Sequence, residues 1–179
     1  MRMIDWRAAA LSAFACGSPT MGQPMAPQRQ SVFTKLEPKA CRLVEENLGA
    51  GPYWIRRCKG PAGWRLDWSE DDLREDLRLI AADGRETELR LTELVANGAF
   101  NSLGDTIEWR GRGPAKPDRL IVRVKVANHA DAGGPDISKL AVVRLTGTPC
   151  VVAIVGPGHG QSQKAREIAD RPMRVCMSD

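Results

Sequence analysis

The chain has 179 residues, of which 26 are Lys or Arg and 22 are Asp or Glu, so its formal net charge at pH 7 is +4. This length accommodates one domain and a further segment, and it excludes a large multidomain enzyme. With 42% hydrophobic and 27% charged residues, the composition is that of a globular protein and excludes disordered, collagen-like and coiled-coil chains.

The first thirty residues have the layout of an export signal. Two arginines precede a short apolar stretch over residues 8–16, and a region rich in small residues and prolines follows. The stretch is shorter than the roughly 20 residues of a membrane-spanning helix. We therefore predict that residues 1–30 are a signal peptide with a short flexible segment, and that there is no transmembrane span. Cleavage after Ala15 would leave Cys16 at the new N-terminus, a lipid-anchoring alternative, whereas Asp5 in the basic region suits a disordered cytosolic tail.

The remaining residues, 31–179, carry 23 basic and 21 acidic side chains, because the first thirty hold three of the basic residues and one of the acidic ones. Such a balanced surface supplies little of the positive charge that neutralises phosphates. Nucleic acid is therefore not expected as a partner.

Beyond the signal, the chain is predicted to form a series of short strands. Alternation is clearest at Leu120–Val126, where four apolar residues share one face. The sequence also predicts a loop at 98–104 and a last helix over 162–170, which Pro172 ends. Further strands are predicted over residues 31–36, 53–58, 64–68, 88–94, 106–110, 140–145 and 150–155.

Two segments fit a helix or a strand. One is 39–47. In the other, 70–81, a pattern like a capping box precedes leucines at helical spacing, but Leu73, Leu77 and Leu79 also share one face of a strand. Asp83–Gly84 marks a turn in either case.

These elements predict a mainly β (α+β) fold, a single antiparallel β-rich domain over 31–179 with a C-terminal helix. The sheet is expected to be antiparallel because most links are too short for crossover helices.

Four cysteines, Cys41, Cys58, Cys150 and Cys176, remain in the exported part. An even number of cysteines in an oxidising compartment indicates disulfides. Three pairings are possible; the local one, Cys41 with Cys58 and Cys150 with Cys176, is favoured, and each short loop would stabilise the fold by about 3 kcal/mol. No close pair of ligands such as C-x-x-C is present, so no metal site is predicted.

No motif identifies a catalytic residue or a cofactor. Arg74 and Arg78 interrupt a run of acids and predict a neutralised surface, although the acids include the two carboxylates that a glycosidase needs. The loop 156–160 before the last helix lacks the Walker and dinucleotide patterns for phosphates, so a plain connection is favoured. His129, Asp131 and Asp136 fit no standard calcium loop. The acids are Glu70, Asp71, Asp72, Glu75 and Asp76.

Four tryptophans outside the signal are candidates for interaction, because tryptophan stacks on sugars and anchors protein interfaces. Core filling is the expected role for most of them. Trp64, Trp68 and Trp109 are the predicted interaction residues, and Trp64 and Trp68 would share a strand face; Trp54 is the fourth.

Five blocks of the chain also carry a resemblance: 33–36, 58–63, 72–74, 100–110 and 165–170. In this order they resemble a family of small, uncharacterised exported proteins of alphaproteobacteria, over nearly the whole domain. The resemblance implies a signal peptide, disulfide-forming cysteines at the four positions given above, and a strand rather than a helix at 72–79. It implies no activity.

We therefore expect a periplasmic or secreted protein that acts without catalysis as a binding or interaction module of the cell envelope. Its partner would be an envelope protein or glycan, and a specific version is an inhibitor of cell-wall-cleaving enzymes. The alternative is a small periplasmic hydrolase with a site built from loops.

Overall fold

The computed structural model describes residues 29–128, 130–131, 133–172 and 175–177. The predicted signal segment up to residue 28, with the possible lipid site at Cys16, lies outside the described residues, and so does His129.

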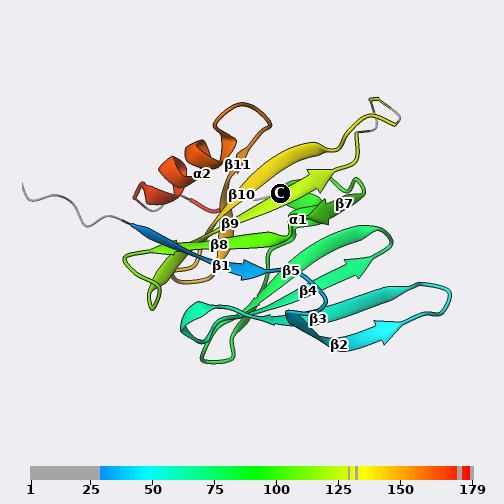
Figure 1. Ribbon diagram of the computed structural model, residues 1–179, viewed down its shortest axis with the longest axis horizontal. Coiled ribbons are helices and arrows are strands. Elements are labelled where there is room, and N and C mark those ends of the chain that lie inside the picture. The colour runs from blue at the N-terminus through cyan, green and yellow to red at the C-terminus, as the bar shows by residue number, and fades with distance from the viewer. Residues whose placement is uncertain (1–28, 129, 132, 173–174, 178–179) are drawn as a thin grey trace, which may run out of the picture.

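Eleven strands of the described chain form one strongly curled sheet, and a helix near the C-terminus covers part of it (Figure 1). This confirms the predicted mainly β fold with a C-terminal helix. The strands are β1 (Gln30–Lys35), β2 (Cys41–Asn47), β3 (Tyr53–Lys59), β4 (Arg65–Asp71), β5 (Arg74–Ile80), β6 (Glu86–Glu88), β7 (Asn101–Leu103), β8 (Thr106–Gly111), β9 (Pro117–Val126), β10 (Ile137–Arg144) and β11 (Cys150–Val155). The helices are α1 (Leu91–Leu94), α2 (Gln161–Asp170) and a single 3-10 turn, Pro61–Gly63.

The order of the strands divides the sheet into two halves. One half contains β1, β8, β9, β10 and β11, and the other contains β2 to β6 in hairpin order. The short strand β7 joins them, pairing with β9 on one side and with β5 on the other. All pairings are antiparallel except that of β5 with β7, which is a single parallel pair.

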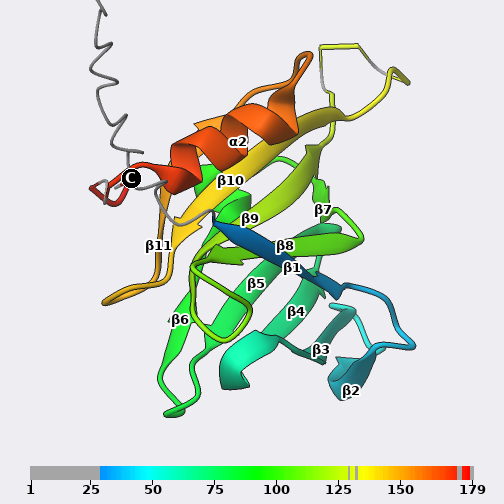
Figure 2. The ribbon, with the colours of Figure 1, turned by 60° about the vertical axis from the view of Figure 1, so that its left-hand side comes forward.

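The molecule has three layers. Helix α2 lies on β9, β10 and β11, and the half-sheet β2–β6 lies on the opposite side of these strands (Figures 1 and 2). The main core fills the space between the two half-sheets, and a smaller apolar cluster fills the space under α2.

Strand β9 separates the two apolar clusters. Leu120, Val122 and Val124 belong to the main core, whereas Ile121 packs in the cluster under α2. This confirms the alternation predicted for 120–126, and the strand begins three residues earlier than expected. A strand with apolar layers on both faces needs apolar residues on both, and Ile121 meets this need.

The two ambiguous segments are strands. Residues 41–47 form β2, and 70–81 contains the end of β4, the turn and β5. The helical alternative is wrong because Asp72 and Leu73 form a two-residue turn with positive φ angles of 49° and 60°. Positive φ at both positions is the geometry of the tight hairpin turn that matches the twist of the strands.

Two of the sequence-based predictions between residues 86 and 104 are wrong. The predicted strand 88–94 is the end of β6 followed by α1, because the Asp76 carboxylate accepts the Leu91 and Thr92 N–H groups at 3.0 and 3.2 Å and so begins the helix. The predicted loop 98–104 contains β7, whose pairing with β9 is not visible in its own sequence.

The cysteines form the predicted local pairs. Cys41–Cys58 links the neighbouring strands β2 and β3, and Cys150–Cys176 links the start of β11 to the C-terminal segment. Met177 in that segment donates its N–H to the Val151 carbonyl at 2.8 Å. Among the described residues, no helix has the length and apolar character needed to cross a membrane.

Candidate functional site

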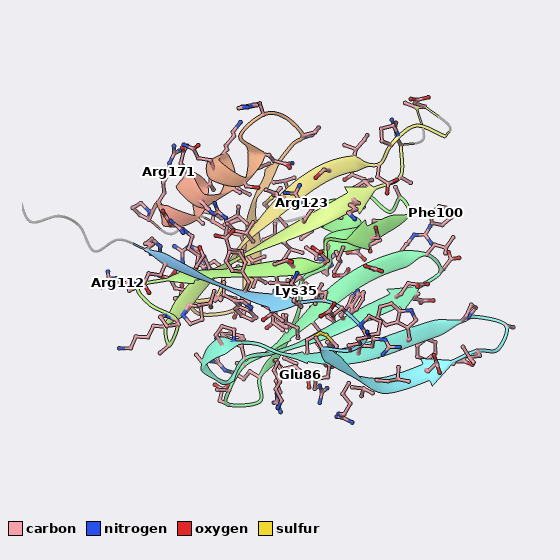
Figure 3. The ribbon with its side chains drawn as sticks, in the orientation of Figure 1. Lys35, Glu86, Phe100, Arg112, Arg123 and Arg171 are labelled. Carbon is pink, nitrogen blue, oxygen red and sulfur yellow. A yellow bond between two sulfur atoms is a disulfide. The ribbon has the colours of Figure 1, made fainter. Side chains whose placement is uncertain are left out.

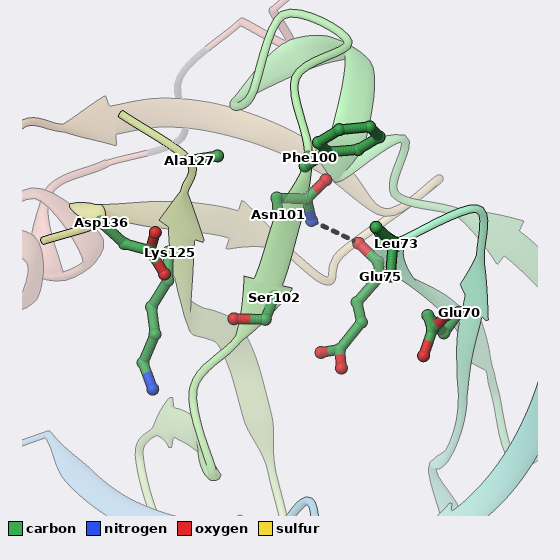
Figure 4. Close-up of a pocket in the computed structure, with 9 residues that line it drawn as sticks. All are labelled: Glu70, Leu73, Glu75, Phe100, Asn101, Ser102, Lys125, Ala127 and Asp136. Atoms are coloured by element: carbon green, nitrogen blue, oxygen red, sulfur yellow. Dashed lines mark hydrogen bonds between the residues drawn. The ribbon is translucent and has the colours of Figure 1, made fainter. Parts of the chain in front are cut away.

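The candidate site lies where β5 and β7 separate. These strands pair only at Arg74 and Asn101. Beyond that pair, the side chain of Glu75 takes the place of a strand partner, because its carboxylate accepts the Leu103 N–H at 2.6 Å. The Asn101 amide donates to the Glu75 carbonyl at 2.7 Å (Figure 4). Glu75 is therefore fixed at its backbone and at one carboxylate oxygen.

A pocket of about 240 Å³ opens beside Glu75. Figure 4 shows the side chains of Glu70, Glu75 and Lys125 extending toward the same side of their strands, with Ser102 between Glu75 and Lys125. The lining contains three carboxylates and a single ammonium group, so the pocket is negative overall. The lining residues are Glu70, Leu73, Glu75, Phe100, Asn101, Ser102, Lys125, Ala127 and Asp136.

Glu70 and Glu75 are direct neighbours across the β4–β5 hairpin. Directly opposed residues of an antiparallel pair have Cβ atoms about 5 Å apart on the same face. Glu70 accepts the Trp54 indole N–H at 3.0 Å. In the described part of the chain, no basic side chain comes within the 4.0 Å of an ion pair to either carboxylate. Among the described residues, two acids thus face each other without a basic side chain at ion-pair distance.

The environment of Glu75 raises its pKa. Burial is the largest cause, and the nearby Glu70 carboxylate acts in the same direction. The Leu103 N–H, the Trp68 indole and Lys125 oppose the shift, but the pKa of Glu75 stays above its ordinary value. The folded protein therefore disfavours the charge of Glu75.

A tryptophan pair continues the face that carries Glu70 and Glu75. Trp54 and Trp68 meet edge to face, with ring centroids 4.6 Å apart, and the Arg56 guanidinium lies 5.7 Å from the Trp54 ring. The Trp68 indole N–H is shielded from solvent and makes no hydrogen bond of normal length and angle, although it lies close enough to Glu75 to favour the charged carboxylate. The nearest acceptor to this buried donor is therefore the Glu75 carboxylate.

The rim of the pocket is apolar. Leu73, in the strained hairpin turn, is 64% exposed, and Phe100 is 39% exposed. The Arg74 guanidinium lies 4.6 Å from the Phe100 ring, and it also bonds to Asp72 and to the Gly98 carbonyl. Exposed apolar side chains at the rim of a polar pocket are typical of a binding site.

The predicted interaction tryptophans are in three different places. Trp68 adjoins the pocket. Trp109 is completely buried, with its indole N–H 2.9 Å from the Thr34 hydroxyl. Trp64 is half-buried, 6.2 Å from Trp109 between ring centroids, and lines a separate cavity of about 300 Å³ near the β10–β11 turn. Trp54, the fourth candidate tryptophan, donates its indole N–H to the pocket carboxylate of Glu70.

The five acids of residues 70–76 are not one neutralised surface. Asp72 pairs with Arg74, as expected, and Asp76 is half-buried and holds the start of α1. Burial raises the pKa of Asp76 against the opposing effect of the bound N–H groups. The expectation is wrong for Glu70 and Glu75, because the hairpin turns their side chains into the pocket, away from the arginines.

The other candidate residues of the sequence analysis contribute little to this site. Asp136 lines the pocket, whereas Asp131 and His159 are exposed in loops. The described part of the chain contains no group of three or more His, Cys, Asp or Glu side chains that could hold a metal ion.

Sequence reasoning missed Ser102 and Lys125. They enter the pocket because β7 pairs with β9 in the register that places Ser102 opposite Lys125. A serine in a predicted loop and a lysine on an alternating strand give no signal of this pairing.

Comparisons of the chain with protein-family models, with curated proteins and with solved structures found no match. The resemblance to a family of exported proteins therefore stays a prediction, and a function has to be argued from the chemistry of the pocket.

Proposed function

We propose that the protein is an exported, non-catalytic binding module of the cell envelope, and that the pocket between Glu70, Glu75 and Lys125 is its ligand site. The two disulfides support export, because such bonds persist in oxidising compartments. The partner is an envelope glycan or an envelope protein.

The opposed, unpaired carboxylates carry the proposal. A carboxylate that only stabilises a fold is normally paired with a basic group or fully bonded to donors. Within the described chain, Glu70 and Glu75 instead have no basic group at ion-pair distance and line an open pocket: Glu70 accepts from the Trp54 indole, and Glu75 accepts from the Leu103 N–H. A pocket with convergent polar groups and a carboxyl of shifted pKa is the usual form of a ligand site.

Co-sedimentation with purified cell-wall sacculi tests the proposal. The wild type is expected to sediment with the sacculi, and Glu70→Gln/Glu75→Gln to remain in solution. Glu86→Gln/Glu88→Gln is the matched control, because it removes the same charge from the exposed strand β6; Figure 3 shows Glu86 far from the pocket residue Phe100. Equal sedimentation of the wild type and the pocket variant would show that the pocket is not the site for the wall.

A narrower version makes the protein an inhibitor of cell-wall-cleaving enzymes. This version predicts that the purified protein lowers the rate at which lysozymes clear a cell-wall suspension. A panel of lysozymes that keeps full activity in the presence of excess protein rejects the inhibitor, without affecting the binding proposal.

A small hydrolase is the second candidate, favoured by one observation. Glycoside hydrolases use two carboxyls, one kept protonated by its environment, and Glu75 with a raised pKa lies opposite Glu70. In the co-sedimentation experiment a hydrolase would release soluble sugar fragments, and Glu75→Gln would abolish the release. Binding without release supports the module.

A further inference from the structure

We propose that the pocket holds a positively charged amino group of its ligand between Glu70 and Glu75, and that the ligand is an amine-bearing sugar. This inference rests on the proposed function, since it takes the pocket as the ligand site.

The charges around the pocket favour the binding of a cation. Glu70 and Glu75 repel each other across the hairpin, and Lys125 is too distant for an ion pair with either of them. Burial of Glu75 increases the cost of this repulsion, because water screens it less. A bound cation that contacts both carboxylates would offset both effects.

An organic ammonium group fits this position better than a metal ion. A divalent ion needs several oxygen ligands converging at about 2–2.6 Å, and no group of three such side chains occurs among the described residues. An ammonium group has three donors at hydrogen-bond distance. It can donate to one oxygen of each glutamate while a third donor stays with water.

The wall of the pocket opposite the two glutamates offers hydrogen-bond donors, which favours a ligand that also has oxygen acceptors. Lys125 and Ser102 bring an ammonium and a hydroxyl group to this wall. An amine on an alkyl chain would leave these donors without partners, which is unfavourable when they are desolvated. A sugar ring has hydroxyl and ring oxygens around its amino group, and the Phe100 ring at the pocket rim offers apolar surface to its C–H face.

The test is a titration of the ¹⁵N-labelled full-length protein, followed by NMR, with three probes at a mildly acidic pH that keeps amines charged. The probes are a trimer of glucosamine, the same trimer with every amine acetylated, and Nα-acetyl-lysine methylamide. The glucosamine trimer is expected to shift the amide signals of β4, β5 and β7, and to bind at least about tenfold more tightly than either other probe, since one bond to a charged group has about this effect.

The matched variants are Glu70→Gln, Glu70→Gln/Glu75→Gln and the control Glu86→Gln/Glu88→Gln. Both pocket variants should lose about tenfold or more in affinity for the glucosamine trimer, and the control should lose none. The single variant keeps the Glu75 bond to Leu103, so it remains informative if the double variant does not fold.

Each contrary result overturns one part of the inference: the ammonium group, the sugar or the ligand site. Equal affinity for the acetylated trimer at the same signals overturns the ammonium group and keeps the pocket as a ligand site. Equal affinity for the lysine probe overturns the sugar. If no probe shifts the amide signals at the pocket, this inference is overturned. The proposed function would still stand if the pocket variants lose sacculus binding.

Discussion

At the scale of single residues, Glu75 combines a structural bond with an unpaired charge. Its carboxylate replaces a strand partner for Leu103, so the fold needs an acceptor there but does not need the charge. A glutamine has the same acceptor oxygen without the charge. The two roles can therefore be separated by one substitution.

Glu75→Gln is expected to change how stability depends on pH. The folded protein raises the pKa of Glu75, so this group contributes stability that is complete below its ordinary pKa and is lost as the pH rises through the raised value. The variant lacks this loss, so its free energy of unfolding relative to the wild type should increase between about pH 4 and pH 7. Urea unfolding at a series of pH values measures the difference between the variant and the wild type. A difference that stays constant with pH would contradict the prediction.

The buried Trp109–Thr34 bond allows a second prediction. The Trp109 indole N–H is buried and donates to the Thr34 hydroxyl. Thr34→Val keeps the shape but leaves this N–H without an acceptor, which should lower the free energy of unfolding by about 1–3 kcal/mol. Thr34→Ser keeps the hydroxyl, so its free energy of unfolding should fall by less than that of the valine variant. Chemical unfolding measures both, and a valine variant as stable as the wild type would show that the bond contributes nothing.

At the scale of elements, the β4–β5 hairpin is joined by a turn without glycine. Leu73 has a φ of 60° and a largely exposed side chain. An L-residue in this left-handed region costs about 1–2 kcal/mol, and a glycine avoids that cost at an entropic penalty of about 0.5–1 kcal/mol. Leu73→Gly should therefore stabilise the protein by about 0.5–1 kcal/mol.

The same substitution should weaken ligand binding, because Leu73 forms part of the pocket rim. Leu48→Gly is the matched control: Leu48 is also exposed, but its φ is not positive, so this variant should not gain stability. Thermal unfolding of both variants, with the sacculus assay on the same samples, measures the two effects. A destabilised Leu73→Gly would mean that the turn is not strained.

The hairpin also explains why part of the fold could be predicted from the sequence and part could not. Strand β9 was predictable because Leu120, Val122, Val124 and Val126 face the main core, whereas Arg123 and Lys125 on the other face are not buried. The β4–β5 region was ambiguous because its turn, Asp72–Leu73, contains no glycine or proline to interrupt the leucines. Helix α1 was missed because its first N–H groups bond to Asp76, a residue of another element.

The pocket could not be predicted from the sequence without knowing how the strands pair. Glu70 and Glu75 are five positions apart, and only the two-residue turn places them opposite each other. Ser102 and Lys125 join them through the β7–β9 register. The sequence marked the acids as a group, but the charge pattern alone predicted a neutralised surface, because it does not say which face each side chain takes.

At the scale of the whole molecule, the two disulfides lie in different half-sheets. Cys41–Cys58 closes a sequence separation of 17 residues and Cys150–Cys176 one of 26. Removing either pair by Cys→Ala should lower the free energy of unfolding by about 3 kcal/mol, and distant effects add, so removing both should cost about 6 kcal/mol. That approaches the whole stability of a typical domain. Unfolding of the two double variants and of the reduced wild type measures this, and a reduced protein that keeps its stability would contradict it.

The N-terminal end of the described chain sets a limit on processing. Arg29 is largely buried and forms ion pairs with Asp118 and Asp170, so the folded domain already includes this residue. If the chain is exported, the signal must be cleaved before Arg29, and lipid attachment at Cys16 would leave a linker of about a dozen residues.

The intact mass of the protein recovered from its native compartment, with and without reduction and thiol labelling, checks the export prediction. We expect a shortened chain that retains Arg29. Apart from Cys16, the cysteines of the chain should react with the thiol label only after reduction; these are Cys41, Cys58, Cys150 and Cys176. An added lipid mass on a chain beginning at Cys16 would select the anchored form. A full-length chain with free thiols would contradict export, because the disulfides of the folded domain then would not form where the protein resides.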